Sequence, residues 1–391
     1  MHAAEPLSQA RARTRVLAAL LAAGGRPVSG AALAESLGVT RTALWKHIEA
    51  LRRQGWPIAA RPHRGYTLDP QAASRMTAHR FVPELLEARR LGCRLGHTVH
   101  WLEEVGSTND VARRLAEAGA AEGTVVLAGR QRAGRGRLRR WWWSPPGGLW
   151  MSVILRPTLP PERLSLLTLA AAAAVAEAVE GQAERPVALK WPNDVLIDDR
   201  KVAGILLESV AHPDGAEYVV AGIGVNLDVE GEPVPAELEG RLTWLAREAP
   251  RPVSRNDLAE AILERLEARY GQLHQEGAEP VLAAWRARAA WLGEPVRVTL
   301  PTGEVVGIAL DVAADGALVV EQADGRRRRV LAGDVQRLRP AEAAGVRPVE
   351  AGARPAEAGV RPAEAAGVRP AEGAGGSTAT SPGAPRGDGA P

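Results

Sequence analysis

Two lysines lie close together in a chain that otherwise uses arginine. The stretch LKWPNDVLIDDRKVAGILLE, residues 189–208, holds Lys190 and Lys201, whereas the chain has 49 basic residues and only three of them are lysine. A lysine ammonium is a compact charge on a flexible stem, and an arginine guanidinium is a rigid planar fork. The pair therefore indicates a site where point charges reach anionic oxygens. Chance, or for Lys201 an exposed position in a turn, would account for the same residues. Asp194 lies between the two lysines and is a candidate partner for Mg²⁺ or for a lysine.

A second segment combines arginine with glycine: GRQRAGRGRLRRWWWSPPGGLWMS, residues 129–152. Its six arginines fall within eleven positions: Arg130, Arg132, Arg135, Arg137, Arg139 and Arg140. Guanidinium groups this close repel one another unless an anion joins them, and glycines allow the backbone to approach a ligand. We therefore expect a mobile loop that orders around phosphate, although it lacks the Walker pattern. A solvated basic surface or a nucleic-acid patch is the alternative. Three tryptophans follow, and we expect one to pack inward and one to cover a ligand.

Two shorter segments carry polar groups that suit a ligand. In GSTND, Ser107 or Thr108 is expected to cap a helix that begins near Asn109, which leaves hydroxyls and free N–H groups at the helix start. GIGVN, residues 222–226, places two glycines and Asn226 at the end of an apolar run. Both segments are expected at the border of a binding site.

A mixture of strands and helices must position these segments. Residues 187–191 alternate as a strand that Pro192 ends, and residues 198–200 read as a turn before Lys201 opens the return strand. Gly204 in that strand indicates the close approach of a ligand or of backbone. The Ala-rich run at residues 164–179 is too short to cross a bilayer, so we expect a buried helix. The fold class predicted for residues 81–290 is α+β, or a mixed α/β domain.

The N-terminal part reads as a winged helix-turn-helix. Residues 1–69 carry ten Arg or Lys against four Asp or Glu, a net charge of +6 that favours a nucleic-acid partner. Ser29 and Thr40 are expected to cap two successive helices, and residues 56–68 read as a hairpin. The side chains expected to face DNA are Arg41, Thr42, Trp45 and Lys46 on the recognition helix, and Arg61, His63 and Arg64 on the wing. A small helical interaction domain is the alternative.

The remaining segments complete the expected domain plan. Residues 70–80 are a connector. Residues 291–339 read as a small antiparallel barrel. Residues 340–391 repeat Pro-containing units without aromatic residues, which predicts a disordered tail. The single Cys93 excludes an internal disulfide, and without a signal peptide we expect a cytoplasmic protein.

Taken in order, GSTND, GRGRLRRWWWSPPGGLWMS, KWPNDVLIDDRKVAGILLE and GIGVN resemble the biotin–protein ligases. With a winged helix in front, the chain is similar to the bifunctional ligases that also repress the biotin operon. The likeness covers about residues 10–338. It implies a central domain of the class II synthetase-like type and a C-terminal SH3-like barrel. One departure stands out, because Arg139 occupies a loop position where the family commonly has glycine.

The resemblance also implies a chemistry and a site. These enzymes join biotin and ATP into biotinoyl-5′-AMP, with Mg²⁺, and then pass biotin to a lysine of a biotin carboxyl carrier protein. The catalytic residues implied are Lys201, Arg135, Arg137, Lys190 and Asp194, with Asp194 also a metal ligand. The biotin-binding residues implied are Ser107, Thr108, Asn109, Gln131, Arg135, Gly136, Arg137 and Lys201. Trp142 and Asn226 are expected on the nucleotide side.

The resemblance also implies regulation through DNA binding, and other functions remain as alternative hypotheses. Bound biotinoyl-5′-AMP would favour a homodimer that binds a two-part DNA operator. The alternatives are a regulator that senses the ligand without ligase activity, a lipoate or octanoate ligase, and a ligase whose winged helix no longer regulates. No membrane partner is expected.

Overall fold

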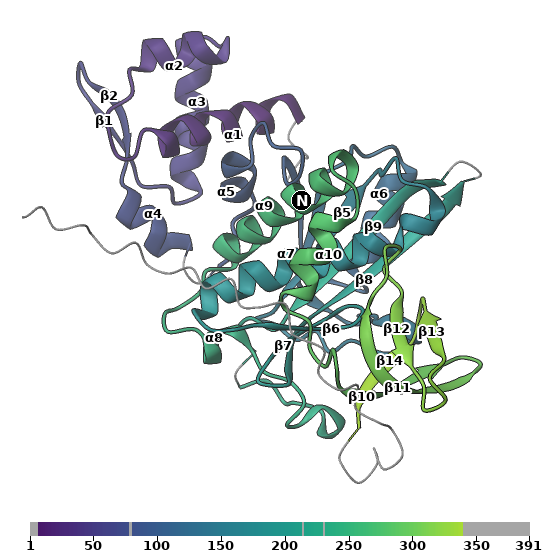
Figure 1. Ribbon diagram of the computed structural model, residues 1–391. Helices are drawn as coiled ribbons and strands as arrows, with labels where there is room; N and C mark the ends of the chain where they lie inside the picture. The colour runs from purple at the N-terminus through teal and green to yellow at the C-terminus, as the bar shows by residue number, and fades with distance from the viewer. Residues whose placement is uncertain (1–6, 78–79, 213–214, 230, 339–391) are drawn as a thin grey trace, which may run out of the picture. The chain divides into compact units, whose positions relative to one another are not determined.

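The structure is a computed structural model that describes residues 7–77, 80–212, 215–229 and 231–338 (Figure 1). The expected tail at residues 340–391 lies outside the described residues.

The N-terminal part has the expected helix-turn-helix and hairpin. Its elements are α1 (Leu7–Ala22), α2 (Gly30–Leu37), α3 (Arg41–Arg53), β1 (Ile58–Arg61) and β2 (Gly65–Leu68). The hydroxyls of Ser29 and Thr40 accept backbone N–H groups at the starts of α2 and α3, as expected from their positions. At the hairpin, Gly65 has φ of 96°, and a Cβ there would lie 2.0 Å from the carbonyl oxygen of Val28. Only glycine fits this turn.

The expected connector contains a helix, and the next helix joins the N-terminal core. These are α4 (Pro70–Thr77) and α5 (Pro83–Arg89). Ala73 of α4 and Leu85 of α5 pack in the same hydrophobic cluster as α1 and α3. Asn256, which is fully buried, accepts the N–H of Val82 at 2.9 Å and donates to its carbonyl at 2.8 Å. This paired contact ties the start of α5 to the central domain.

The central domain is built on a seven-stranded mixed sheet. Its strands run in the order β3-β4-β5-β9-β8-β7-β6, with only the β3–β4 pair parallel. They are β3 (Thr98–Val105), β4 (Thr124–Gln131), β5 (Leu149–Leu155), β6 (Ala188–Lys190), β7 (Asp194–Ile197), β8 (Arg200–His212) and β9 (Gly215–Val225). This arrangement confirms the α+β prediction.

Helices cover both faces of this sheet, because its strands alternate two apolar sets. Val125 and Leu127 face one core, and Val126 between them faces the other. The α-helices are α6 (Thr108–Glu117), α7 (Ser165–Ala183), α8 (Leu245–Glu248), α9 (Arg255–Gln275) and α10 (Glu279–Arg286); single 3₁₀ turns are η1 (Arg137–Arg139), η2 (Pro161–Arg163) and η3 (Ala236–Leu238). α6 packs on the face of Val126, and α7, α9 and α10 pack on the opposite face (Figure 1).

The Ala-rich helix is longer than the sequence indicated. Together with the turn before it, α7 forms a helical stretch, Pro161–Ala183, that is long and apolar enough to cross a membrane by length and composition alone. Thirteen of the 19 residues of α7 are buried, and the helix packs between the sheet and α9. The expected buried helix is therefore confirmed, whereas the argument from its length was wrong.

The C-terminal part is a five-stranded antiparallel sheet. Its strands are β10 (Pro295–Leu300), β11 (Gly303–Val312), β12 (Leu318–Glu321), β13 (Arg327–Val330) and β14 (Asp334–Arg337), in the order β13-β12-β11-β10-β14. β14 begins at Asp334, which lies against the cavity of the central domain.

Candidate active site

A cavity of about 470 Å³ brings the separate sequence segments together. All the residues expected to serve catalysis, biotin or nucleotide line it: Ser107, Thr108, Asn109, Gln131, Arg135, Gly136, Arg137, Trp142, Lys190, Asp194, Lys201 and Asn226. They come from the start of α6, the end of β4 and the loop after it, strands β6 to β8, and the residue that follows β9. Their chemistry divides the cavity into a charged end and a neutral end.

The charged end is built on the β6–β7–β8 meander around Asp194. The Nζ of Lys201 lies 2.5 Å from one carboxylate oxygen of Asp194, and the Nζ of Lys190 lies 3.2 Å from the other. The tight turn between β7 and β8 places Asp198 and Asp199 at φ of 48° and 59°. Arg200, which was expected in the turn, already opens the return strand, and Lys201 is its second residue. The two lysines that stood out in the sequence thus converge on one carboxylate.

Asp194 is a buried acid held in its ionised form. Burial by itself would raise the pKa of its carboxyl. The ammonium groups of Lys201 and Lys190 outweigh that effect, and they hold the pKa below its ordinary value. The carboxylate therefore fixes two cations at the cavity wall.

Two glycines on adjacent strands make room for a tryptophan beside Lys201. Gly204 pairs with Gly224 across β8 and β9, and a Cβ on Gly224 would lie 2.6 Å from the indole nitrogen of Trp142. The Nζ of Lys201 lies 4.7 Å from the centre of a Trp142 ring, within cation–π range. A Cβ on Gly204 would lie 3.0 Å from the Trp142 ring, so the approaching group is a side chain and not the ligand or backbone that was expected.

The C-terminal sheet supplies residues that sequence reasoning missed. Asp334 lies 3.6 Å from the Nζ of Lys190 and 3.0 Å from a guanidinium nitrogen of Arg140. Gly333 and Trp291 also line the cavity. No sequence signal marked them, because they reach the cavity only through the packing of two domains.

The arginine–glycine loop is held by carboxylates of the protein itself. Glu104 pairs with both Arg130 and Arg132, and Asp334 pairs with Arg140. The sequence predicted that an anion would join these arginines, and here side chains provide it. At the loop tip Leu138 and Arg139 both have φ of 57°, the left-handed region that glycine adopts most easily.

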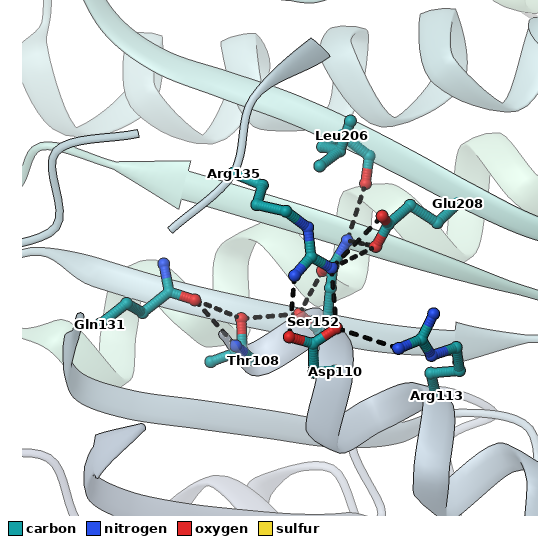
Figure 2. Close-up of polar contacts among 9 residues, drawn as sticks. Thr108, Asp110, Arg113, Gln131, Arg135, Ser152, Leu206 and Glu208 are labelled. Atoms are coloured by element: carbon teal, nitrogen blue, oxygen red, sulfur yellow. Dashed lines mark hydrogen bonds and ion pairs between the residues drawn. The ribbon is translucent and has the colours of Figure 1, made fainter. Parts of the chain in front are cut away.

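Two arginines of this loop differ in their partners. Arg135 makes two hydrogen bonds to Asp110, at 2.7 and 2.8 Å, and also reaches Glu208 at 3.2 Å (Figure 2). Arg137 donates to the carbonyl of Gly333 at 3.1 Å and has no ion pair within 4.0 Å among the described residues. Burial lowers the pKa of the Arg137 guanidinium. Arg137 is thus the loop cation that an incoming anion would stabilise most.

The neutral end lies where α6 meets β4 and β5. The N–H and hydroxyl of Thr108 both donate to Gln131 Oε1, at 2.8 and 3.0 Å. The hydroxyl of Ser152 lies 2.7 Å from Thr108 Oγ1 and 2.6 Å from Asn109 Oδ1, and donates to one of them at a time (Figure 2). Asn109 in turn donates to Glu208 at 2.7 Å. Apart from Glu208, which pairs with Arg135, the side chains of this network are uncharged, which suits a polar, uncharged head group.

The expected side-chain cap of α6 is not formed. Ser107 occupies the N-cap position, but its side chain makes no cap hydrogen bond. The N–H of Thr108 goes to Gln131 instead. Ser152 was missed, although a single hydroxyl in the apolar run LWMSVIL was a signal for it.

Asn226 stabilises the backbone beside the cavity. Its Nδ2 donates to the carbonyl of Thr243 at 3.1 Å, and the N–H of Lys201 donates to the carbonyl of Arg241 at 2.9 Å. Residues 241–243 therefore run beside the start of β8 and hold the backbone of Lys201.

No group of three His, Cys, Asp or Glu side chains that could hold a metal occurs in the part of the chain that the structure describes. Both carboxylate oxygens of Asp194 already face ammonium groups. The side chains around Asp194 therefore do not form a resident metal site.

The residues expected to face DNA lie elsewhere, on α3 and the β1–β2 hairpin. All seven are exposed, and Trp45 is 54% exposed, which is unusual for so large an apolar side chain. All seven belong to the small basic N-terminal domain, and none of the residues that line the cavity comes from this domain.

Comparisons with known proteins match each part of the chain. Residues 13–67 match an HTH domain, residues 101–226 the biotin/lipoate A/B protein ligase family, and residues 291–338 a biotin protein ligase C-terminal domain. The bifunctional ligase/repressor BirA of Bacillus spizizenii is 34% identical over 80% of this chain and 95% of its own length. That of Escherichia coli is 33% identical over 82% and 96%.

A solved structure is similar as well. The biotin protein ligase from Aquifex aeolicus in complex with biotin and ATP is 30% identical, with a TM-score of 0.55 over 62% of this chain and 99% of that one. The chain therefore belongs to the biotin protein ligase family and has the domains of its bifunctional ligase/repressors.

Proposed function

We infer that this protein is an ATP-dependent biotin–protein ligase that also acts as a biotin-responsive transcriptional repressor. The observation that carries the ligase function is a single cavity with a neutral polar end and a cationic end. Biotin has the same division, because its head group is uncharged and its carboxylate must meet the triphosphate of ATP.

In the first reaction, a biotin carboxylate oxygen bonds to the α-phosphorus of ATP and pyrophosphate leaves. The biotin carboxylate, the α-phosphate and the departing pyrophosphate are all anionic, so their repulsion makes up much of the activation barrier. Lys201 and Arg137 hold the carboxylate and the α-phosphate together and stabilise the charge that develops. Lys190 and Asp194 orient Lys201 and the phosphates. Ser107, Thr108, Asn109 and Gln131 hold the head group, with the backbone of Gly136 close to it.

In the second reaction, the amine of an acceptor lysine attacks the acyl carbon of biotinoyl-5′-AMP. A C–N bond forms, AMP leaves with the electron pair of the C–O bond, and the amine loses a proton. The acceptor is a biotin carboxyl carrier protein. Trp142 and Asn226 lie on the nucleotide side.

Mg²⁺ enters as part of the ATP substrate. The two ammonium groups at Asp194 leave that carboxylate little capacity for a cation, so phosphate oxygens supply most ligands of the ion. Asp194 is at most one ligand among them.

The repressor function depends on the winged helix. Arg41, Thr42, Trp45 and Lys46 enter a major groove, and Arg61, His63 and Arg64 contact the backbone beside it. Biotinoyl-5′-AMP favours a homodimer, which binds a two-part operator. The exposed basic residues of this domain support DNA binding.

The finer architecture follows the same assignment. We propose a class II synthetase-like domain at residues 81–290, an SH3-like barrel at 291–339, a winged helix at 1–69 joined by residues 70–80, and a disordered tail at 340–391. A cytoplasmic location is proposed on the same grounds.

Two assays test the assignment. Wild-type protein with ATP, Mg²⁺ and biotin, octanoate or lipoate should form an adenylate and pyrophosphate with biotin alone, measured by mass spectrometry. An adenylate of octanoate or lipoate instead would assign the lipoate-type ligase. In a gel-shift assay, the protein should bind biotin-operon DNA when biotinoyl-5′-AMP is added. If it binds this DNA but forms no adenylate in the first assay, it is a sensor without ligase activity.

A further inference from the structure

Arg135 is held more firmly than any other arginine of the ligand loop. Asp110 of α6 and Glu208 of β8 both contact its guanidinium, and neither residue belongs to the loop (Figure 2). Arg135 is 34% exposed and Asp110 is 28% exposed, so water screens this ion pair only partly. The hydrogen bonds from Arg135 lower the pKa of Asp110, so the carboxylate stays ionised.

The two carboxylates lie outside the cavity that Arg135 lines. Neither Asp110 nor Glu208 is among the residues that form the cavity wall, whereas Arg135 is. The carboxylates therefore hold the arginine from behind, and they do not occupy the place of a ligand. Their two negative charges are balanced by Arg135 and by Arg113, which lies 3.3 Å from Asp110, next to the uncharged side chains of Thr108 and Asn109.

Arg135 also lies at the base of the loop. Its backbone pairs with Trp141, and the N–H of neighbouring Gly136 donates to the carbonyl of Arg140 at 2.8 Å. The segment between Arg135 and Trp141 carries Arg137 and closes one side of the cavity. Fixing Arg135 thus fixes both ends of the segment that covers a bound ligand.

We propose that Asp110, together with Glu208, is a latch that positions Arg135 and so sets how long the loop retains the acyl-adenylate. Asp110 is a positioning residue, because it acts through Arg135 and does not touch the ligand. This proposal rests on the proposed ligase function. It predicts that loss of the Asp110 charge speeds ligand release and leaves ligand entry largely unchanged.

The experiment uses the full-length chain and a non-hydrolysable biotinyl-adenylate analogue. Its dissociation and association rates are measured by surface plasmon resonance for wild type and for Asp110→Asn. We expect dissociation to become about fivefold faster and association to stay within about twofold, since a partly exposed bidentate ion pair is lost. Glu104→Gln is the matched control, because it removes a carboxylate of β3 that pairs with Arg130 and Arg132 of the same arginine-rich segment, and it should leave both rates within about twofold.

A double-mutant cycle separates the latch from damage to α6. Asp110 lies in the first turn of α6, where a negative charge also stabilises the helix. If Asp110 acts through Arg135, Asp110→Asn adds less than about twofold to the dissociation rate in an Arg135→Ala background. A fivefold effect of Asp110→Asn on the dissociation rate in the Arg135→Ala background would overturn the proposal. So would an Asp110→Asn single variant whose rates match those of Glu104→Gln. Wild type that fails to bind the analogue at all would instead refute the proposed function.

Discussion

The two ends of the cavity solve opposite electrostatic problems. At the charged end, one buried carboxylate holds two ammonium groups, and Arg137 lies close by without an ion pair in the described part of the chain. At the neutral end, hydroxyl and amide groups bond to one another, and the charges of Arg135 and Arg113 balance those of Asp110 and Glu208. One end keeps cations available for an anion, and the other removes net charge around an uncharged group.

The largest effect is expected at Asp194. Asp194→Asn leaves Lys190 and Lys201 without the carboxylate between them, which should lower the free energy of unfolding by about 3 kcal/mol. Urea denaturation measures it. Asp334→Asn is the control, because Asp334 lies 3.6 Å from Lys190 and its closer partner, Arg140, is 58% exposed, so its loss should cost less than about 1 kcal/mol. Equal losses in both variants would mean that Asp194 does not organise the charged end.

Arg137 should affect ATP more than biotin, because biotin keeps the contacts of its uncharged head group. Arg137→Gln removes a desolvated cation from the charged end, so KM for ATP should rise about tenfold. The Kd for biotin alone, measured by calorimetry, should stay within about twofold of wild type. A comparable loss of biotin affinity would contradict the separation of the two ends.

Ser152 should affect biotin and not ATP, because its hydroxyl lies at the end of the cavity proposed for the uncharged head group. Ser152→Ala removes a fully buried hydroxyl that holds Thr108 and Asn109 in place, so Kd for biotin should rise about fivefold while KM for ATP is unchanged. Thr124→Val is the control, since it removes a buried hydroxyl that bonds to the carbonyl of Ala121 outside the cavity. If both variants weaken biotin equally, the effect of Ser152 is not local.

The smallest effect concerns the loop tip between the two ends. Arg139→Gly should raise the free energy of unfolding by roughly 0.5 kcal/mol. Glycine adopts the φ of 57° without strain, and the strain removed exceeds the conformational entropy that glycine loses on folding. Arg140 has φ of −69°, so Arg140→Gly should lower it by about 0.5 to 1 kcal/mol. Urea denaturation of both variants should give shifts of opposite sign. Two shifts of the same sign would show that backbone conformation does not govern this loop.

Local signals predicted the elements of the fold well. Caps at Ser29 and Thr40 and the turn before Lys201 were all readable, because short-range hydrogen bonds and backbone preferences determine them. The side chain of Ser107 forms no cap, and the first N–H of α6, that of Thr108, bonds to Gln131 of another strand. Such a tertiary contact at a helix start cannot be predicted from local sequence.

Cavity residues were predictable where they belong to compact motifs. The contrast between lysine and arginine marked Lys190 and Lys201, and both do converge on Asp194. Asp334 and Glu208 were not predictable, because only the packing of distant segments brings them to Lys190 and Arg135. Carboxylates in such places have no signature in the sequence.

The central claim is that biotin recognition and acyl transfer occupy different ends of one cavity. The measurement that tests it most directly is Lys201→Ala, assayed for biotin binding by calorimetry and for biotinoyl-5′-AMP by mass spectrometry on the same preparation. The account predicts a Kd for biotin within about threefold of wild type and adenylate formation reduced by at least about a hundredfold. Loss of both, or adenylate formation close to wild type, would contradict it.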